Sequence, residues 1–319
     1  METLLLAQSD VRRLLTMELA VEAVEEAFRA HGRGETLMPA KVYLDLAEYD
    51  GDFRAMPAYF SGSAGVKWVN AHPYNPQRFA MPSVRGLYVL SDPANAQPLA
   101  VMDATWLTAA RTGAAAAVAT KYLARPDSAT VGFIGTGVQA RTLLGALRVV
   151  HPELAVVGAD REASSAKVFA AEVDGRYGSL EEAAACDIVC TATPSTTPVV
   201  RRDWIAAGTH INAMGADGPG KQELDTELLK ESTVVIDDAH QATSGGEVNV
   251  PLRRGELDEE SIYATLGKIV AGLQPGRRSA SEITVFDSTG LAIQDVAVGR
   301  RVYDAAVAKG IGQRIDFFA

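Results

Sequence analysis

Charged residues without an evident structural role occur in one glycine-rich loop and in two apolar segments of this chain. Asp217 and Lys221 lie in Asn212-Ala-Met-Gly-Ala-Asp-Gly-Pro-Gly-Lys-Gln-Glu223, where the glycines let a ligand approach the backbone closely. Arg54 and Lys67 interrupt apolar runs that have the composition of strands. A guanidinium binds a carboxylate through two parallel hydrogen bonds and an ammonium binds it as a point charge, so these cations predict a carboxylate site. The alternative is a surface turn, with cations that reach solvent along their apolar stems.

The two strand cations can act together only under one register. Side chains alternate along a strand, so Arg54 and Lys67 share a face if their strands pair about the turn at Gly62 with an odd sum of residue numbers. Lys41, on the neighbouring segment, is a third cation that could reach the same ligand. Arg111 lies among alanines in a helical pattern, and a buried arginine needs an anion such as a cofactor phosphate or a substrate carboxylate.

A glycine pattern predicts a dinucleotide site. Gly135, Gly137 and Ala140 form G-x-G-x-x-A between an apolar run and a helical pattern. The first glycine makes the tight turn, the second admits the diphosphate, and the helix N-terminus supplies unpaired N–H groups. Asp160 follows a second apolar run about 20 residues later, where an acid would bind the ribose 2′-hydroxyl and favour NAD over NADP, whereas the adjacent Arg161 could accept a 2′-phosphate. An ordinary strand–turn–helix that binds nothing is the alternative.

The order of the predicted elements indicates two domains. Short turns separate strand segments at 41–46, 53–60, 64–70, 83–91 and 97–103, which predicts an antiparallel sheet. A strand at 3–7, a short helix capped by Ser9 and a second helix that ends at Gly32 precede these segments. Helical segments separate the later strands, which we expect at 130–134, 154–158, 187–192, 209–214, 233–237 and 283–287.

We therefore expect an α/β protein with a doubly wound parallel (Rossmann) sheet and a smaller α+β domain. Residues 113–299 would form the dinucleotide-binding domain, and residues 1–112 with 300–319 the substrate-binding and dimerisation domain. A long helix near 290–309 would return to the N-terminal sheet. In open parallel sheets ligands bind beyond the carboxyl ends of the strands, which makes Ser288 in Phe286-Asp-Ser-Thr-Gly290 a further candidate, although it could instead cap the following helix.

Composition limits the class of function. The formal net charge is −10, which argues against a nucleic-acid or anionic-membrane partner. No apolar stretch approaches the roughly 20 residues of a membrane span, and the N-terminus lacks a basic leader pattern, so we expect a cytoplasmic protein. Cys186 and Cys190 are expected to be buried free thiols, and the spacing of the five histidines predicts no metal site.

The sequence resembles the ornithine cyclodeaminase/mu-crystallin family over nearly its whole length. Within that family it is most similar to the archaeal-type alanine dehydrogenase branch. The resemblance rests on five motifs, Gly65-Val-Lys-Trp-Val-Asn-Ala-His-Pro73, Ala110-Arg-Thr-Gly-Ala114, Gly132-Phe-Ile-Gly-Thr-Gly-Val-Gln139, Ile211-Asn-Ala-Met-Gly-Ala-Asp-Gly-Pro-Gly-Lys-Gln-Glu-Leu224 and Phe286-Asp-Ser-Thr-Gly290. It implies an NAD(P)-dependent enzyme that dimerises through the N-terminal sheet and has its active site between the domains.

The same resemblance implies residue roles. Lys67 would contact the substrate carboxylate or carbonyl, and Asp217 would be the acid/base for the substrate nitrogen or an attacking water. Substrate contacts would also come from Arg54, Lys41 and Thr289. The cofactor would be lined by Ser83, Arg111, Thr112, Gly135, Gly137, Val138, Gln139, Asp160, Arg161, Thr193, Asn212, Ala213, Met214, Lys221 and Ser288.

Two departures from cyclodeaminases point to a smaller substrate than ornithine. Lys41 replaces an arginine of that branch, as it does in the alanine dehydrogenase branch, and the acid that binds ornithine's distal amine in cyclodeaminases has no obvious counterpart around Arg54-Ala-Met-Pro57. Our hypothesis is reversible, NAD-dependent oxidative deamination of L-alanine to pyruvate and ammonium. A cyclodeaminase (a lyase), a ketimine reductase and a non-enzymatic protein that binds NAD(P)H and a small acid remain as alternatives.

Overall fold

The computed structural model describes residues 2–319, which divide into two compact units. Unit 1 comprises the chain up to Arg111 together with Leu291–Ala319, and unit 2 comprises Thr112–Gly290. Helix α4, Thr105–Leu123, continues from one unit into the other, because its sequence is an uninterrupted alanine-rich stretch. Among the described residues no helix is both long and apolar enough to cross a membrane.

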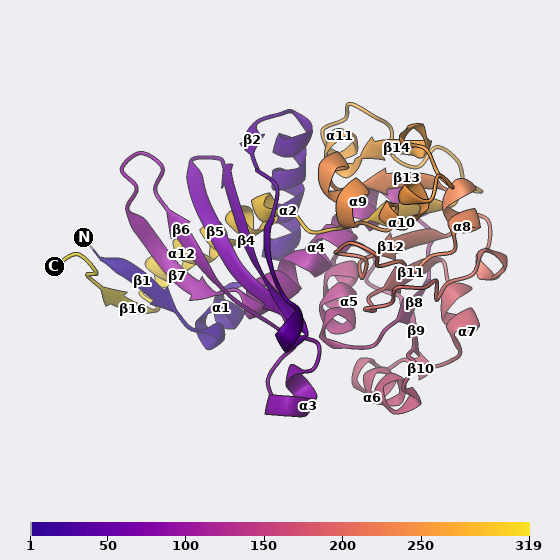
Figure 1. The fold of residues 1–319 in the computed structure, drawn as a ribbon, viewed down its shortest axis with the longest axis horizontal. Coiled ribbons are helices and arrows are strands. Elements are labelled where there is room, and N and C mark those ends of the chain that lie inside the picture. Colours follow the sequence, from indigo (N-terminus) through magenta and orange to yellow (C-terminus); the bar gives the residue numbers. More distant parts are fainter. Residues whose placement is uncertain (1) are drawn as a thin grey trace. The chain divides into compact units, whose positions relative to one another are not determined.

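Unit 1 is built on a mixed, mostly antiparallel sheet (Figure 1). The five strand segments predicted between residues 41 and 103 are confirmed, and each pairs antiparallel with its neighbour. The N-terminal strand runs parallel to the last of them. Along the sheet the strands are β16 (Gln313–Ile315), β1 (Thr3–Leu6), β7 (Pro98–Asp103), β6 (Val84–Ser91), β5 (Ser63–Ala71), β4 (Gly51–Phe60) and β2 (Thr36–Leu37), with β3 (Val42–Leu46) also paired to β4.

A two-residue hairpin sets the register of β4 and β5. Ser61 and Gly62 both have positive φ, 46° and 73°, between the paired residues Phe60 and Ser63. Such a turn matches the right-handed twist of the strands that it joins. As a result Arg54 pairs with Val69 and Met56 pairs with Lys67.

The C-terminal helix packs on this sheet. Helix α12, Ala292–Lys309, contacts α2 (Met17–Gly32) and strands β4, β5 and β6 (Figure 1). Its approach to β6 depends on Gly299, because a Cβ there would lie 2.6 Å from the ring of Tyr88. The other helical segments of unit 1 are α1 (Gln8–Leu14), the 3-10 turn Ala47–Tyr49 and α3 (Asn75–Phe79).

The predicted cap of the first helix is wrong. Ser9 lies inside α1, and the N-cap is Ala7. The Asp10 carboxylate accepts the Ala7 N–H at 3.1 Å, so an acid three residues further on satisfies this backbone group. The second helix ends as expected, since its C-cap Arg33 follows Gly32 and the left-handed Gly34 comes next.

Unit 2 contains an all-parallel sheet with the Rossmann-like arrangement that the sequence predicts (Figure 1). In order across the sheet the strands are β10 (Arg176–Tyr177), β9 (Ala155–Ala159), β8 (Thr130–Ile134), β11 (Ile188–Thr191), β12 (His210–Ala213), β15 (Thr284–Asp287), β13 (Thr233–Ile236) and β14 (Ile262–Thr265). The six predicted strands are confirmed. The sequence analysis did not predict β10 or β14. β10 consists of two exposed residues, and neither strand is strongly apolar.

The chain reverses direction across this sheet at β8. It passes from β8 to β9 and β10, and then returns to β11 on the other side of β8. Such a switch point separates the loops that follow the two neighbouring strands and leaves room for a ligand there. The helices of unit 2 are α5 (Val138–Val150), α6 (Ala163–Val173), α7 (Leu180–Ala184), α8 (Thr226–Lys230), α9 (Ala239–Gly245), α10 (Asn249–Arg253) and α11 (Leu266–Val270), with 3-10 turns at Arg202–Trp204 and Glu259–Ser261.

Two local features of unit 2 follow directly from its sequence. The segment Ser179-Leu-Glu-Glu182 is a capping box at the start of α7, in which the Ser179 side chain accepts the Glu182 N–H while the Glu182 carboxylate accepts the Ser179 N–H. Cys186 and Cys190 are buried free thiols, and burial raises the pKa of Cys190 to about 12, which makes it a poor nucleophile.

Candidate functional site

The glycine turn after β8 has the geometry of a diphosphate site. Gly135 has φ +91°, and a Cβ there would lie 2.7 Å from the Ala192 carbonyl oxygen, so only glycine fits. Gly137 is the N-cap of α5, where no side chain caps the helix. A Cβ on Gly137 would have no heavy atom within 4 Å, so open space lies against the backbone at the helix N-terminus. An uncapped helix N-terminus beside open space suits an anion, and the turn therefore fits the diphosphate of a dinucleotide.

Asp160 directly follows β9 and fixes this turn. One of its carboxylate oxygens accepts the Thr136 N–H at 2.8 Å and the Thr136 hydroxyl at 3.0 Å. The other oxygen accepts the Glu162 N–H at 3.0 Å. Arg161 is exposed and lies 3.8 Å from the Glu162 carboxylate, which competes with any phosphate for its charge. In the first turn of α5, Val138 is 67% exposed, and the Gln139 side chain accepts from a threonine hydroxyl within the same helix.

The loops after β11 and β12 are tied together by Glu223, a residue to which the sequence assigned no role. The fully buried carboxylate accepts the Thr191 hydroxyl at 2.6 Å, the Thr193 N–H at 2.7 Å and the Gly215 N–H at 2.8 Å. Burial raises the pKa of Glu223, and the hydrogen bonds partly offset that effect. Nothing local marked this residue, because its partners come from two other strand ends.

The glycine-rich loop brings two of the predicted residues together. Asp217 and Lys221 form an ion pair, and their side chains are 35% and 28% exposed. Lys221 also lies 3.5 Å from the Gly215 carbonyl oxygen. The flanking Gly218 and Gly220 have open space where a side chain would be. The loop thus presents one carboxylate, one ammonium and accessible backbone.

Not every predicted cofactor residue presents its side chain at a strand end. Asn212 is fully buried, and its amide donates to the Thr120 hydroxyl at 3.0 Å, which ties β12 to α4 inside unit 2. The side chain therefore contacts the interior of unit 2, and its contact with a cofactor stays a prediction. Ala213 is also fully buried, whereas Met214 and Thr112 are each 8% exposed.

The segment after β15 is held by a second buried acid, Asp237. Its carboxylate accepts the Thr289 N–H at 2.7 Å, the Thr289 hydroxyl at 3.1 Å and the Gly290 N–H at 2.8 Å. The alternative that Ser288 caps the last helix is wrong, because the N-cap of α12 is Leu291. Ser288 is 3% exposed, and its N–H donates to the Ala213 carbonyl at 3.0 Å.

Asp287 and Glu247 complete a group of fully buried acids with Glu223 and Asp237. Glu247 accepts the N–H groups of Glu223 and Leu224, the latter at 2.6 Å. Burial, with a smaller effect from Asp237 and Glu223, raises the pKa of Asp287 to about 8. Burial also raises the pKa of Glu247 well above its usual range. These carboxyl groups accept backbone N–H groups and so organise the backbone at the strand ends.

In unit 1 the register places Arg54 and Lys67 on the same face of the sheet, as the odd pairing sum requires. Lys67 is fully buried, and its ammonium lies 2.9 Å from each carboxylate oxygen of Asp295. Arg111, 7% exposed, places Nε 3.3 Å from Asp295 and donates to the Gln294 side chain at 3.1 Å. Arg111 is thus a buried arginine with an anionic partner, but that partner is a helix aspartate that the sequence analysis did not single out.

Burial and charge set the protonation of Lys67. Burial first, and then the Arg111 charge, lower the pKa of Lys67 to about 7, although Asp295 acts in the opposite direction. Lys41 has a smaller lowering effect and is half-buried. An ammonium with a pKa near neutrality can bind an anion and can also exchange a proton at working pH.

Arg54 already binds a carboxylate within its own strand. Its guanidinium donates twice to Asp52, at 2.9 Å from Nε and 2.9 Å from Nη2. Its side chain is 12% exposed and lies over the Tyr43 ring at 5.2 Å. Ser83, a predicted cofactor residue that also lies in this unit, uses its backbone carbonyl to accept the His72 N–H at 2.8 Å.

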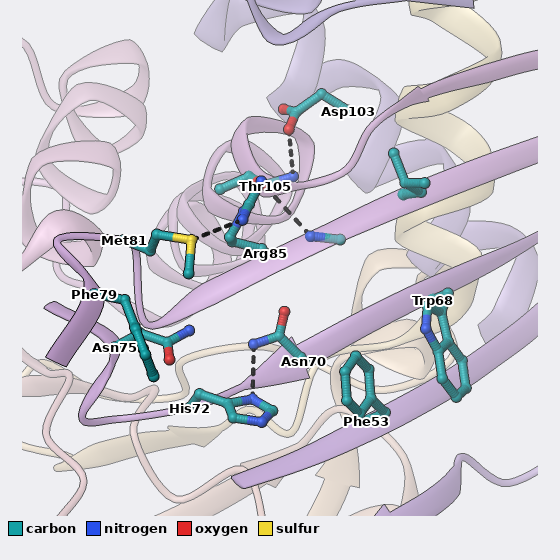
Figure 2. Close-up of a pocket in the computed structure, with 12 residues that line it drawn as sticks. Phe53, Trp68, Asn70, His72, Asn75, Phe79, Met81, Arg85, Asp103 and Thr105 are labelled. Carbon is teal, nitrogen blue, oxygen red and sulfur yellow. Dashed lines mark hydrogen bonds between the residues drawn. The ribbon is translucent and has the colours of Figure 1, made fainter. Parts of the chain in front are cut away.

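A separate pocket of about 570 Å³ lies on the other face of this sheet (Figure 2). Phe53 and Trp68 stack there with ring centroids 5.2 Å apart, and the Asn70 amide lies 3.0 Å from the His72 ring nitrogen. The register places these side chains opposite Lys67, since residues 67 and 68 point to different faces. This pocket therefore does not belong to the Lys67 group.

Comparison with known proteins assigns this architecture. The model of the ornithine cyclodeaminase/mu-crystallin family matches residues 1–310. The chain belongs to this family. An alanine dehydrogenase of Archaeoglobus fulgidus is 51% identical to this family member over 100% of the chain and 99% of the relative.

Two solved structures are also similar to this family member. One is an archaeal alanine dehydrogenase dimer with bound NAD, with a TM-score of 0.96, 50% identity and full coverage of both chains. The other is the Δ1-pyrroline-2-carboxylate reductase of Thermococcus litoralis in complex with NADH and L-proline. Its TM-score is 0.94 and its identity 37%, over 98% of this chain and 100% of that one.

The two glycines of the turn give a matched test of nucleotide binding. We expect Gly137→Ala to leave the free energy of unfolding nearly unchanged, since the Cβ meets no protein atom, but to weaken NADH binding at least about tenfold by filling the diphosphate space. Gly135→Ala should instead destabilise the fold by about 1–3 kcal/mol, because of its positive φ and the Ala192 carbonyl. NADH fluorescence titration and urea unfolding measure the two effects. Unchanged NADH affinity in the folded Gly137→Ala variant would place the diphosphate elsewhere.

The buried acids predict a pH dependence of stability. Asp287 keeps its proton in the folded chain up to about pH 8, whereas the unfolded chain releases it near the ordinary value of 3.8. The stability from this group is therefore complete below about pH 4 and is lost as pH rises toward 8. We expect Asp287→Asn to reduce the fall in urea-unfolding free energy between pH 5.5 and 8, by on the order of 1 kcal/mol or more. The exposed Asp203→Asn variant is the control, and equal slopes in all three proteins would contradict the assignment.

Proposed function

We propose that this chain is an NAD-dependent alanine dehydrogenase. It would convert L-alanine, NAD⁺ and water to pyruvate, ammonium, NADH and a proton, and catalyse the reverse reaction. The observation that carries the proposal is the 51% identity to an alanine dehydrogenase over the full length of both chains. The glycine turn with its open Gly137 supports the cofactor, and the buried cations of unit 1 support a carboxylate substrate.

Unit 2 would hold the cofactor. NAD supplies a hydride acceptor at nicotinamide C4 when it is bound. The backbone at Gly135 and Gly137 and the N-terminus of α5 would bind the diphosphate, and Asp160 would bind a ribose hydroxyl. Because Asp160 already fixes Thr136, binding of the ribose by the same carboxylate would occur on a turn that is ordered in advance.

Arg54 and Lys67 would bind the alanine carboxylate, with Arg111 held beside Lys67 by their shared partner Asp295. Arg54 would share its guanidinium with Asp52, and Lys67 would offer an N–H that Asp295 does not use, since an ammonium carries three. Lys67 is closed off from solvent, so its contact with substrate requires local opening as the substrate enters. Fixing the carboxylate restricts the orientation of Cα, which lowers the entropic part of the barrier.

Asp217 would move the protons. It would take a proton from the alanine ammonium before hydride leaves Cα, and later from the water that attacks the iminium carbon. Its ion pair with Lys221 holds the carboxylate in place on the glycine-rich loop. Asp217 would release the first proton to solvent before water attacks, and would pass the second to the carbinolamine nitrogen. The C–N bond then breaks, ammonia leaves, and loss of the hydroxyl proton gives pyruvate, with ammonia taking up a proton to become ammonium.

The 37% identical reductase structure favours a second candidate, reduction of Δ1-pyrroline-2-carboxylate with NADH. That imine also carries a carboxylate beside a carbon–nitrogen bond, so the same cations would bind it. Relative rates separate the two functions. An alanine dehydrogenase reduces pyruvate with ammonia faster than the cyclic imine, whereas the reductase shows the opposite order and forms no NADH from alanine.

We expect net NADH from L-alanine and NAD⁺ in the wild-type enzyme, with weaker activity on L-ornithine. Asp217→Asn should lower kcat by about 10²–10⁴-fold and leave the Kd for NADH within about twofold, because the substitution removes a proton acceptor and little else. Absorbance of NADH and fluorescence titration measure these quantities. Asp203→Asn, an exposed acid of the same unit, should behave as wild type. An active Asp217→Asn enzyme would refute the acid/base role.

We also propose that the chain forms a homodimer through the outer face of the unit 1 sheet, the face that carries Phe53 and Trp68. The register places Val42, Leu44 and Leu87 on this face as well, and these three side chains are 63%, 50% and 55% exposed. A contiguous exposed apolar surface of this kind usually marks an interface. The similar archaeal structure is a dimer, which supports the proposal.

Leu87→Lys should convert the dimer to a 33.8 kDa monomer, because the lysine would bury an unpaired charge in the interface. Val168→Lys is the matched control, since Val168 is a helix residue of unit 2 that is also 55% exposed. Light scattering coupled to gel filtration gives the masses. A dimeric Leu87→Lys protein would exclude this face, and dissociation of both variants would show a non-specific effect.

A further inference from the structure

We propose that Asp295 is the positioning residue of the substrate carboxylate site, because it holds Lys67 and Arg111 in place and sets the charge of the site that they form. This inference deepens the proposed function and rests on it for the identity of the substrate. None of the residue roles inferred from the sequence involves Asp295.

The contacts of Asp295 join three separate elements. The residue lies in the first turn of α12, Lys67 lies in β5, and Arg111 lies in α4. Both carboxylate oxygens lie 2.9 Å from the Lys67 ammonium, and Oδ1 lies 3.3 Å from Nε of Arg111. A fully buried carboxylate that contacts two cations fixes the position of each relative to the other. Lys67 alone, with four rotatable side-chain bonds, would not be held in this way.

The charge count of this group leaves room for one anion. When Lys67 is protonated, Lys67 and Arg111 contribute two positive charges and Asp295 contributes one negative charge, and all three are less than a tenth exposed, whereas solvent screens the half-buried Lys41. An excess of one buried positive charge is costly unless a partner neutralises it. A singly charged carboxylate would balance the group. With a neutral residue at 295 two charges would be in excess, and Lys67 would lose its proton more readily.

Two side chains next to Lys67 and Asp295 carry buried hydrogen-bond donors that are not used within the described chain. Tyr88 pairs directly with Lys67 across β5 and β6, is fully buried, and its hydroxyl has no hydrogen-bond partner among residues 2–319. Gln294, next to Asp295, is fully buried and its amide nitrogen is also without a partner in the described chain. Burial and the Asp295 charge raise the pKa of Tyr88 well above its usual range, so the hydroxyl keeps its proton. Buried donors beside an excess positive charge lack an acceptor, which a carboxylate would supply.

Asp295 also controls the pH range in which Lys67 is charged. Four groups face Lys67: Arg111 from α4, Asp295 from α12, Tyr88 from β6 and, with a smaller effect, Lys41 from the segment before β3. Burial, Arg111 and Lys41 lower the pKa of Lys67, and Asp295 is the group that raises it. Removing the Asp295 charge should therefore lower that pKa further below about 7. Lys67 would then be neutral under assay conditions and would bind a carboxylate poorly.

The test measures carboxylate binding as a function of pH. Propionate is the probe, since it has the carboxylate and length of alanine but cannot react, and its Ki against alanine is determined from pH 6 to 9. We expect Asp295→Asn to raise this Ki and the KM for alanine at least about tenfold at pH 8 and less at pH 6, where Lys67 regains its proton. Asp304→Asn is the matched control, because Asp304 lies on the same helix in an exposed ion pair with Arg300, and it should stay within about twofold.

Asp295→Glu keeps the charge but displaces the carboxylate by one methylene. We expect it to raise the KM several-fold without moving the pH at which binding weakens, a separation that general destabilisation would not produce. Wild-type KM and pH profile in either folded variant would overturn the role of Asp295. If Asp295→Asn does not fold, Asp295→Glu decides alone. A wild-type enzyme without activity on alanine would reject the proposed function, whereas Asp295-dependent affinity for propionate, then measured by calorimetry, would still support this inference.

Discussion

The buried ion pair between Lys67 and Asp295 is the interaction on which unit 1 depends. An ammonium without exposed surface is stable only beside an anion, and the only one it contacts in the described chain lies 228 residues further along the sequence. The C-terminal helix must therefore complete the N-terminal sheet before the cation is tolerated there. Gly299 permits this approach, since any side chain there would strike the Tyr88 ring. One ion pair thus links the packing of the C-terminal helix on the sheet to the formation of the candidate substrate site.

Unit 2 also buries ionisable side chains, and it stabilises several of them through the backbone. Its buried acids are stabilised by backbone N–H groups, as where Glu223 binds Thr193 and Gly215 and where Asp237 binds Thr289 and Gly290. A backbone amide carries no net charge, so these hydrogen bonds stabilise the carboxyl groups but leave the charge of an ionised carboxylate unbalanced. The raised pKa values of Glu223 and Asp287 show the remaining electrostatic cost. The loops at the strand ends are consequently ordered in the protein alone, which reduces the entropy that a cofactor must remove on binding.

Most of the fold, but only part of the site, could be predicted from the sequence. The strands and the turn at Gly62 were predictable because alternation and turn residues are local signals. The shared face of Arg54 and Lys67 followed from the register that this turn imposes. Asp295 and Glu223 could not be recognised in this way. In sequence each resembles an ordinary helix or loop acid, and only the partners brought from distant segments by the fold reveal its role.

Under the proposed function, the residues that bind the carboxylate differ from those that could choose between substrates. Alanine and Δ1-pyrroline-2-carboxylate both present a carboxylate beside a carbon–nitrogen bond, so a site with one excess positive charge binds either. Lys67, Arg111 and Asp295 therefore account for recognition of the class and cannot choose between its members. A second constraint must make that choice, and size is the feature in which the two substrates differ most. Arg54, the other cation proposed to bind the carboxylate, has a carboxylate partner, Asp52, on its own strand. This ion pair limits how far the Arg54 guanidinium can reach. Because Asp52 restrains the Arg54 guanidinium, the substrate carboxylate can bind it at only one distance from the reacting carbon. Discrimination between substrates by size would therefore arise at the Arg54–Asp52 pair.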